Sequence, residues 1–228
     1  VPLHRRHRGL NQRPLIYLLA FVVTIGSVAT NIYIPALPAV QQYFGASIAE
    51  AQTTFSVALL TFAIGMLVWG PFADRYGRRN ALFAGVGLMA AGSLACLFAP
   101  SLGWLVAGRA VLAFGTANGI AVSRTIVSDL YPGQMARMLA QLAIFAVISS
   151  ASAPVIGGFL TDGFGWRSVF VAQVAMAVAV AWLVWRYLPE TRPAHTSPPD
   201  VPEMARVAGR LLRQPQFVSC VLQSSAAY

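Results

Sequence analysis

Six apolar runs, each about 19 to 23 residues long, constrain this chain more than any other feature of its sequence. A helix needs about 20 apolar residues to cross the hydrocarbon core of a bilayer, so each run is long enough for one crossing. Backbone groups find no water there and the runs lack the alternation of a barrel strand, so we predict helices. The runs lie at about 15–34, 52–72, 81–99, 102–123, 138–160 and 168–188. The fold class is therefore an all-α membrane protein with a six-helix bundle over 15–188.

The composition agrees with a lipid environment and excludes several classes of protein. Only 10% of the residues are charged, whereas a soluble domain is roughly a quarter charged. The net charge of +9 reflects 16 basic residues, all of them arginine, against 7 acidic ones, and the arginines form short clusters between apolar runs instead of one basic face. We therefore expect no nucleic-acid partner. No Cys or His cluster at metal-ligand spacing and no phosphate-binding Gly-Lys motif occur in the sequence, so we expect no metal, no cofactor and no enzyme activity.

The arginines also predict the orientation of the bundle. If the N-terminal tail, 1–14, is cytoplasmic, fourteen arginines lie at inner ends or in inner loops. Only Arg167 then lies outside, while Arg109 lies within the fourth run. This split follows the positive-inside rule.

The first run is expected to be an uncleaved helix, because its apolar stretch is longer than a secretory signal core and five more runs follow it.

The last 40 residues differ in composition from the bundle. Residues 189–214 are expected to form a cytoplasmic linker that opens with a proline-rich stretch. Apolar residues between Met204 and Leu212 then recur at helical spacing, which indicates either a short amphipathic helix on the inner leaflet or a solvated linker. A seventh apolar run opens at Phe217 and reaches only Tyr228. We expect 215–228 to be the truncated start of a second transmembrane half.

An internal repeat relates the second and fifth runs. Gly70–Arg79 and Gly158–Arg167 both read Gly-x3-Asp-x2-Gly-x-Arg, 88 residues apart. Three runs separate the copies, so they lie on opposite sides of the membrane, which predicts a 3+3 inverted repeat of the kind found in transporters. We expect each copy to be a loop of about seven or eight residues whose Asp caps the next helix. The first copy carries four charges, which are either parts of a well-made turn or a charge lock: Asp74, Arg75, Arg78 and Arg79.

Several stretches resemble motifs of one family. Gly70–Arg79 resembles the signature loop between the second and third helices of the major facilitator superfamily. The stretch 31–38 and the stretch 153–158 resemble the first-helix and fifth-helix motifs of its twelve-helix drug:proton antiporters, particularly the bicyclomycin-resistance type. Arg109 followed by Gly115 and Gly119 resembles the fourth-helix motif of the same group, and 189–192 resembles the end of the sixth helix. The sequence departs from the group at Asn31, where Asp is common, and at Ala153, where Gly is usual.

The resemblance implies an N-terminal half of a secondary transporter in a bacterial-type cytoplasmic (inner) membrane. Its expected activity is proton-coupled efflux of drugs or other small amphipathic compounds by alternating access. The expected partners are a small-molecule substrate, protons, the lipid bilayer and the missing C-terminal half, without which the 228 residues are expected to insert but transport nothing. Two alternatives stay open. One is a transporter of the same superfamily for a metabolite or sugar, and the other is a truncated, transport-inactive membrane protein.

Candidate site residues follow from the motifs and from polar residues within the runs. For gating by a charge lock the candidates are Gly70, Asp74, Arg75, Gly77, Arg78 and Arg79. Arg109, about 10 Å into its run, is the candidate for proton coupling; alternatively its side chain snorkels outward or binds carbonyls of a neighbouring helix. No acid lies deep in any run, so the proton carrier is not assigned.

Three polar residues and one bend complete the candidates. Asn31, Tyr33 and Asn118 are expected to line a substrate cavity, or to hydrogen-bond neighbouring helices. Pro154, Gly157 and Gly158 are expected to form a bend with a thin face. The resemblance makes this bend an antiporter hinge, while its composition alone also fits ordinary helix packing.

Overall fold

The computed structural model describes residues 12–188 except 132, and this part of the chain is helical and contains no strand. The expected linker at 189–214, the seventh run at 215–228 and most of the N-terminal tail lie outside the described residues. Within the described residues, six helical segments are long and apolar enough to cross a membrane. The elements are α1 (Gln12–Asn31), the 3-10 helix η2 (Ile34–Ala36), α2 (Leu37–Phe44), α3 (Ile48–Tyr76), α4 (Arg78–Leu97), α5 (Leu102–Leu130), α6 (Met135–Phe164) and α7 (Arg167–Tyr187). The all-α bundle predicted from the apolar runs is therefore confirmed.

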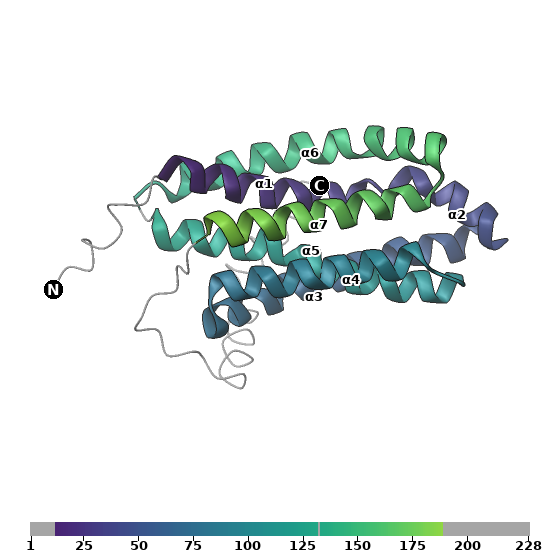
Figure 1. Cartoon of the computed structure of the whole chain (residues 1–228), viewed down its shortest axis with the longest axis horizontal. Coiled ribbons are helices and arrows are strands. Elements are labelled where there is room, and N and C mark those ends of the chain that lie inside the picture. The colour runs from purple at the N-terminus through teal and green to yellow at the C-terminus, as the bar shows by residue number, and fades with distance from the viewer. Residues whose placement is uncertain (1–11, 132, 189–228) are drawn as a thin grey trace, which may run out of the picture. The chain divides into compact units, whose positions relative to one another are not determined.

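The long helices run side by side along one axis, with α2 at the end where α3 begins (Figure 1). Helices α1 and α5 are the most enclosed, because α5 packs extensively against α3 and α4, and α1 packs against α6 and α5. Helices α3 and α6 are the least enclosed and carry bare apolar side chains such as Leu67 and Phe159. The bundle thus has an interior pair of helices and two helices whose outer faces are free to contact lipid or another part of the protein.

Small residues allow α4 and α5 to approach closely. A Cβ added at Gly92 of α4 would collide with the backbone of Leu112, and one at Gly115 of α5 would collide with the backbone of Met89. Apolar burial drives little association between helices in lipid, so close van der Waals packing and interhelical hydrogen bonds must hold such a bundle together. The α4–α5 interface is built in this way.

The two copies of the sequence repeat form the junctions α3–α4 and α6–α7. Helix α3 continues to Tyr76 and α4 begins at Arg78, so the junction is the single residue Gly77, with φ 95°. In the second copy α6 continues to Phe164 and turns at Gly165, with φ 80°. The expected loops of seven or eight residues are therefore wrong. A glycine in this Gly-favoured region reverses the chain within one or two residues, so most of each motif completes the preceding helix.

The junctions lie at opposite ends of the bundle (Figure 1). A shift of 88 residues places α3 on α6 and α4 on α7, with helix bounds that agree within about one or two residues. The same shift places α1 and α2 together on α5. The inverted arrangement predicted from the repeat is thus present in the order and lengths of the helices.

Candidate functional site

Three charged side chains join α3, α4 and α5 at one end of the bundle, and we call Asp74, Arg78 and Asp129 the ion cluster. Arg78 Nη2 lies 2.7 Å from an Asp74 carboxylate oxygen and 3.0 Å from Asp129 Oδ2. Arg78 Nε also donates to Asp129 Oδ2, at 3.1 Å, and Nη1 donates to the carbonyl of Ala73, at 3.1 Å. The Arg78 side chain is only 5% exposed, while those of Asp74 and Asp129 are 40% and 23% exposed. Arg78 is therefore the buried centre of a tie between three helices.

The sequence identified only part of this cluster. The cap expected from Asp74 on the next helix is absent, since α4 has no side-chain cap and Asp74 instead lies in the last turn of α3, four residues before Arg78. Asp129 was not a candidate, because it follows the fourth run 51 residues after Arg78. A topological signal for it exists: the second and fourth runs both end on the predicted inner side. Two carboxylates, those of Asp74 and Asp129, are thus available as acidic groups at this end of the bundle.

The other charged residues of the first copy have different surroundings. Arg79 Nη2 donates to the carbonyl of Trp185 in the last turn of α7, at 3.0 Å. The Arg75 guanidinium lies 5.5 Å from the ring of Tyr76. A Cβ added at Gly70 would meet nothing within 4 Å, so the described part of the chain does not require glycine there.

The second copy of the repeat repeats one contact of the first. Arg167 is the counterpart of Arg79, and its Nε donates to the carbonyl of Leu97, the last residue of α4, at 3.1 Å. The start of α4 therefore binds the end of α7, and the start of α7 binds the end of α4. Carbonyls in the last turn of a helix have no partner within it, and an arginine satisfies both this need and the helix dipole. We call these two hydrogen bonds the reciprocal arginine contacts.

The second copy has no counterpart of the ion cluster among the described residues. The position of Arg78 is occupied by Trp166, whose ring packs 5.4 Å from that of Tyr43 and 5.8 Å from that of Phe44. The Arg167 guanidinium stacks over the rings of Trp166, at 4.3 Å, and Tyr43, at 4.5 Å. Aromatic rings therefore pack at the α6–α7 end of the bundle, whereas the ion cluster lies at the α3–α4 end.

Arg109 lies inside the bundle with an aromatic partner and no acidic one among the described residues. It is 2% exposed, and its guanidinium carbon lies 3.8 Å from the centre of the Tyr33 ring. Its Nε is buried and has no hydrogen-bond partner in the part of the chain that the structure describes. Tyr33, in turn, is fully buried and shares a hydrogen bond of 3.0 Å with Thr54 Oγ1 of α3. The alternative in which this side chain snorkels outward is therefore wrong, and the buried cation keeps at least one donor free of partners among the described residues.

The asparagines expected in a cavity bind neighbouring helices. Asn31 Nδ2 donates to the carbonyl of Ser27, at 2.9 Å, and to Ser150 Oγ of α6, at 3.3 Å. Asn118 is 1% exposed, and its Nδ2 donates to the carbonyl of Ala81 of α4, at 2.9 Å. Of the two alternatives left open by the sequence, interhelical hydrogen bonding is the one that this conformation contains.

Pro154, Gly157 and Gly158 all lie within α6, and of the two glycines only Gly157 lies at a close contact with another segment among the described residues. Gly157 is buried against the carbonyl of Ile32, and an added Cβ would collide with it. Gly158 faces open space, so close approach at this position is not found in the described residues. Helix α6 passes through Pro154 without a break. The thin face therefore consists of Gly157 packed on Ile32, the residue after α1.

Comparisons with known proteins agree with this architecture. A family model described as Major Facilitator Superfamily matches residues 19–228. Multidrug resistance protein D of Escherichia coli is 30% identical over 190 residues, which are 83% of this chain and 48% of that protein. Multidrug resistance protein Stp of Mycobacterium tuberculosis is 30% identical over 189 residues, 80% of this chain and 35% of that protein.

A solved structure shows the same fold at lower identity. The crystal structure of the peptide transporter POT in complex with sulfate superposes with a TM-score of 0.71 at 17% identity, covering 92% of this chain and 45% of that one. The chain spans about half the length, or less, of the relatives it matches. Its six helices correspond to the N-terminal half of the fold.

Proposed function

The chain belongs to the major facilitator superfamily, and from this membership we propose that it acts in a secondary transporter that exports drug-like or other small amphipathic compounds in exchange for protons. Relatives named as multidrug resistance proteins support efflux over other kinds of transport. The resemblance of 31–38 and 153–158 to motifs of the bicyclomycin-resistance type supports antiport. In this proposal residues 1–14 and 189–214 are cytoplasmic and 215–228 begin the second half.

The ion cluster is the observation that carries the mechanism. Arg78 is held by one carboxylate from α3 and one from α5, so any movement that separates these helices at this end must break a charge-assisted hydrogen bond. Such bonds are about twice as strong as neutral ones, yet the partly exposed carboxylates can be re-solvated when they separate. We assign the cluster the role of a lock that holds the predicted cytoplasmic end closed in one state of alternating access and opens in the other.

Asp74→Asn tests the lock. Asp74 is 40% exposed, so the lost pair is worth about 1 kcal/mol, or roughly a fivefold shift between states. Efflux by the protein expressed from its complete gene should fall about fivefold, while equilibrium binding of the same compound to purified protein changes less than twofold. An equal loss of efflux and of binding would contradict a gating role.

Arg109 is proposed to couple transport to protons. A buried guanidinium with an unpartnered Nε can bind an acid or an ordered water that approaches it during the cycle, and its charge shifts the pKa of that acid. Arg109→Ala should abolish proton-driven efflux, and Arg109→Lys should rescue it in part, since Lys keeps the charge but loses the planar fork that stacks on Tyr33. Full activity of the alanine variant in a proton-driven assay would show that Arg109 is structural.

The orientation is a proposal that labelling tests directly. In a background with Cys96 and Cys220 replaced by Ala, single cysteines near Arg75 and Arg137 should be shielded from an impermeant thiol reagent in intact cells. A cysteine near Asp162, at the opposite junction, should react. Permeabilised cells, in which all three positions should label, provide the control. Labelling of the first two in intact cells would reverse the orientation.

A further inference from the structure

Helices α1 and α7 meet along a seam that is closed at one end and open at the other. At the closed end, Gln173 Nε2 of α7 donates to the carbonyl of Ala29 of α1, at 2.8 Å. At the other end, where α1 begins and α7 finishes, the helices leave a pocket of about 340 Å³. The lining is apolar and aromatic: Tyr17, Leu18, Phe21, Leu183 and Tyr187.

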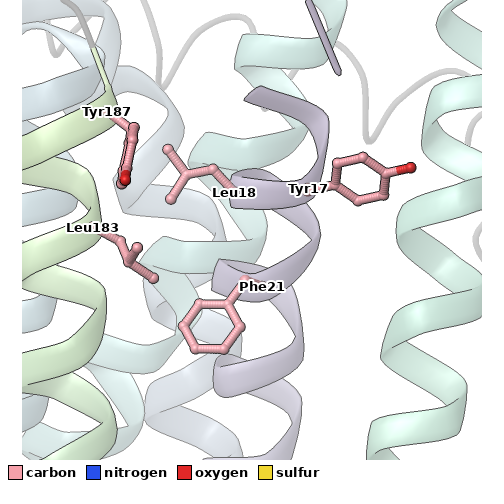
Figure 2. Close-up of a pocket in the computed structure, with 5 residues that line it drawn as sticks. All are labelled: Tyr17, Leu18, Phe21, Leu183 and Tyr187. Carbon is pink, nitrogen blue, oxygen red and sulfur yellow. The ribbon is translucent and has the colours of Figure 1, made fainter. Parts of the chain in front are cut away.

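The side chains that form the pocket face one another across the seam. Leu18 and Phe21 from α1 lie opposite Leu183 and Tyr187 from α7, while the Tyr17 ring points away to the other side of α1 (Figure 2). The end of α7 is also tied to α4, because Arg79 donates to the carbonyl of Trp185. The seam therefore ends in an open, apolar pocket, next to the end of α7 that is hydrogen-bonded to α4.

A cation lies beside one lining residue of the pocket, in an interfacial setting. Arg186 is exposed, forms no ion pair within the described part of the chain, and lies 5.3 Å from the ring of Tyr187. Trp182 and Trp185 on the same stretch of α7 are 56% and 64% exposed. Exposed Trp and Tyr next to Arg at the end of an apolar helix are typical of the membrane–water interface, where phospholipid headgroups lie.

We propose that this pocket binds one acyl chain of an anionic phospholipid whose phosphate pairs with Arg186. The pocket is near the small end of ligand pockets, roughly 300–1,000 Å³, which suits a single chain, and its lining offers few polar groups to a polar ligand. A cation next to the lining residue Tyr187 complements a phosphate and favours anionic over zwitterionic lipid. The proposal rests on the membrane-spanning fold and is independent of the compound transported.

Lipid retention by purified protein tests the site. Protein from the complete gene, in mild detergent, is incubated with phosphatidylglycerol or phosphatidylcholine, and bound lipid is counted by native mass spectrometry. Arg186→Gln should lower phosphatidylglycerol retention about fivefold and leave phosphatidylcholine unchanged. Leu183→Trp, which fills the pocket, should lower retention of both lipids. The matched controls are Arg124→Gln, an exposed arginine that does not line the pocket, and Leu67→Trp, an exposed leucine of α3.

Three results would overturn the proposal. The first is Arg186→Gln retaining as much phosphatidylglycerol as Arg124→Gln, a test that does not depend on the fold tolerating a new indole. The second is Leu183→Trp behaving like Leu67→Trp, as it would if another part of the protein covered the pocket. The third is equal displacement of phosphatidylglycerol by glycerol phosphate, which has the headgroup without the chains and would indicate a site for free phosphate.

Discussion

The α3–α4 and α6–α7 junctions come from one repeated motif, yet they close their ends of the bundle with different chemistry. They share a glycine at positive φ, Gly77 in one and Gly165 in the other. They also share the reciprocal arginine contacts, through Arg79 and Arg167. These common features fix the backbone reversal and clamp α4 against α7 at both ends, so they belong to the architecture.

The difference between the junctions lies at one position of the motif. Arg78 in the first copy binds two carboxylates, whereas its counterpart Trp166 packs among aromatic rings. An ion pair can be exchanged for water when the helices part, while separated aromatic rings expose apolar surface at a cost of about 25 cal/mol per Å². The comparison teaches that the repeat supplies two similar joints, which differ in the chemistry of a single side chain at one position.

Among changes at the two junctions, the largest expected effect comes from removing the acid that binds Arg78 twice. Asp129→Asn loses the contacts of Nε and Nη2 with the carboxylate, worth about 2 kcal/mol for hydrogen bonds to a charged group, so efflux should fall roughly tenfold or more. Asp162→Asn is the matched control, because Asp162 corresponds to Asp74 in the second copy and forms no ion pair in the described part of the chain. Equal losses in the two variants would remove the functional distinction between the junctions.

A second prediction concerns what the junctions share. Gly77→Ala and Gly165→Ala should each destabilise the protein by about 1–3 kcal/mol, because an L side chain at these dihedral angles is strained. The strain is in the backbone alone at Gly165, where an added Cβ would meet nothing within 4 Å. Thermal unfolding in detergent measures the effect, with Gly87→Ala as a helical control that also faces open space. A stable Gly165→Ala variant would show that this junction does not need its present geometry.

The third prediction separates the two reciprocal arginine contacts by size. Arg167→Gln loses its bond to Leu97, its bond to Tyr43 and stacking on two rings, in total about 2 kcal/mol. Arg79→Gln loses one hydrogen bond and a looser contact with Phe83, about 1 kcal/mol. The melting temperature should therefore fall further for Arg167→Gln. The reverse order would mean that the aromatic cluster contributes little.

The smallest effect is expected at the first glycine of each copy. Gly70 and Gly158 lie within helices and an added Cβ meets nothing within 4 Å at either position. Alanine should be tolerated and should stabilise the helices by up to about 1 kcal/mol. Loss of efflux by Gly70→Ala with unchanged thermal stability would show that this glycine is needed in another conformation, and the same loss at Gly158 would make the copies equivalent.

The sequence predicted the helices well because membrane burial has a local signature. Run length alone placed all six crossings, and the repeat placed the two junctions at opposite ends. The predicted end of the first helix was imprecise, because α1 stops at Asn31 and the chain continues through η2 into α2. Pro35 and Pro38 signal this change, but their effect on helix direction depends on packing that a single run does not encode.

The candidate site was predicted less well because its contacts are long-range. Arg78 and Asp129 are 51 residues apart, and Arg79 and Trp185 are 106 apart. The sequence could predict that polar residues within apolar runs are buried, but it could not predict which groups they contact. Asn118 donates to a carbonyl of α4, and the ring of Tyr33 lies under the Arg109 guanidinium. Such pairings depend on helix rotation and neighbour order, which composition and spacing leave open.

The reciprocal arginine contacts also determine the order in which the helices can acquire their partners during synthesis. Arg79 leaves the ribosome 106 residues before Trp185, which at about 5–20 residues per second is roughly 5 to 20 s. During that interval Arg79 and the carbonyl of Leu97 in α4 are without the partners that α7 supplies. Both bonds form only when α7 arrives, so the last helix of the bundle completes the first repeat as well as its own. A ribosome pause before 167–187 would therefore prolong the period in which chaperones or proteases can act on a five-helix intermediate.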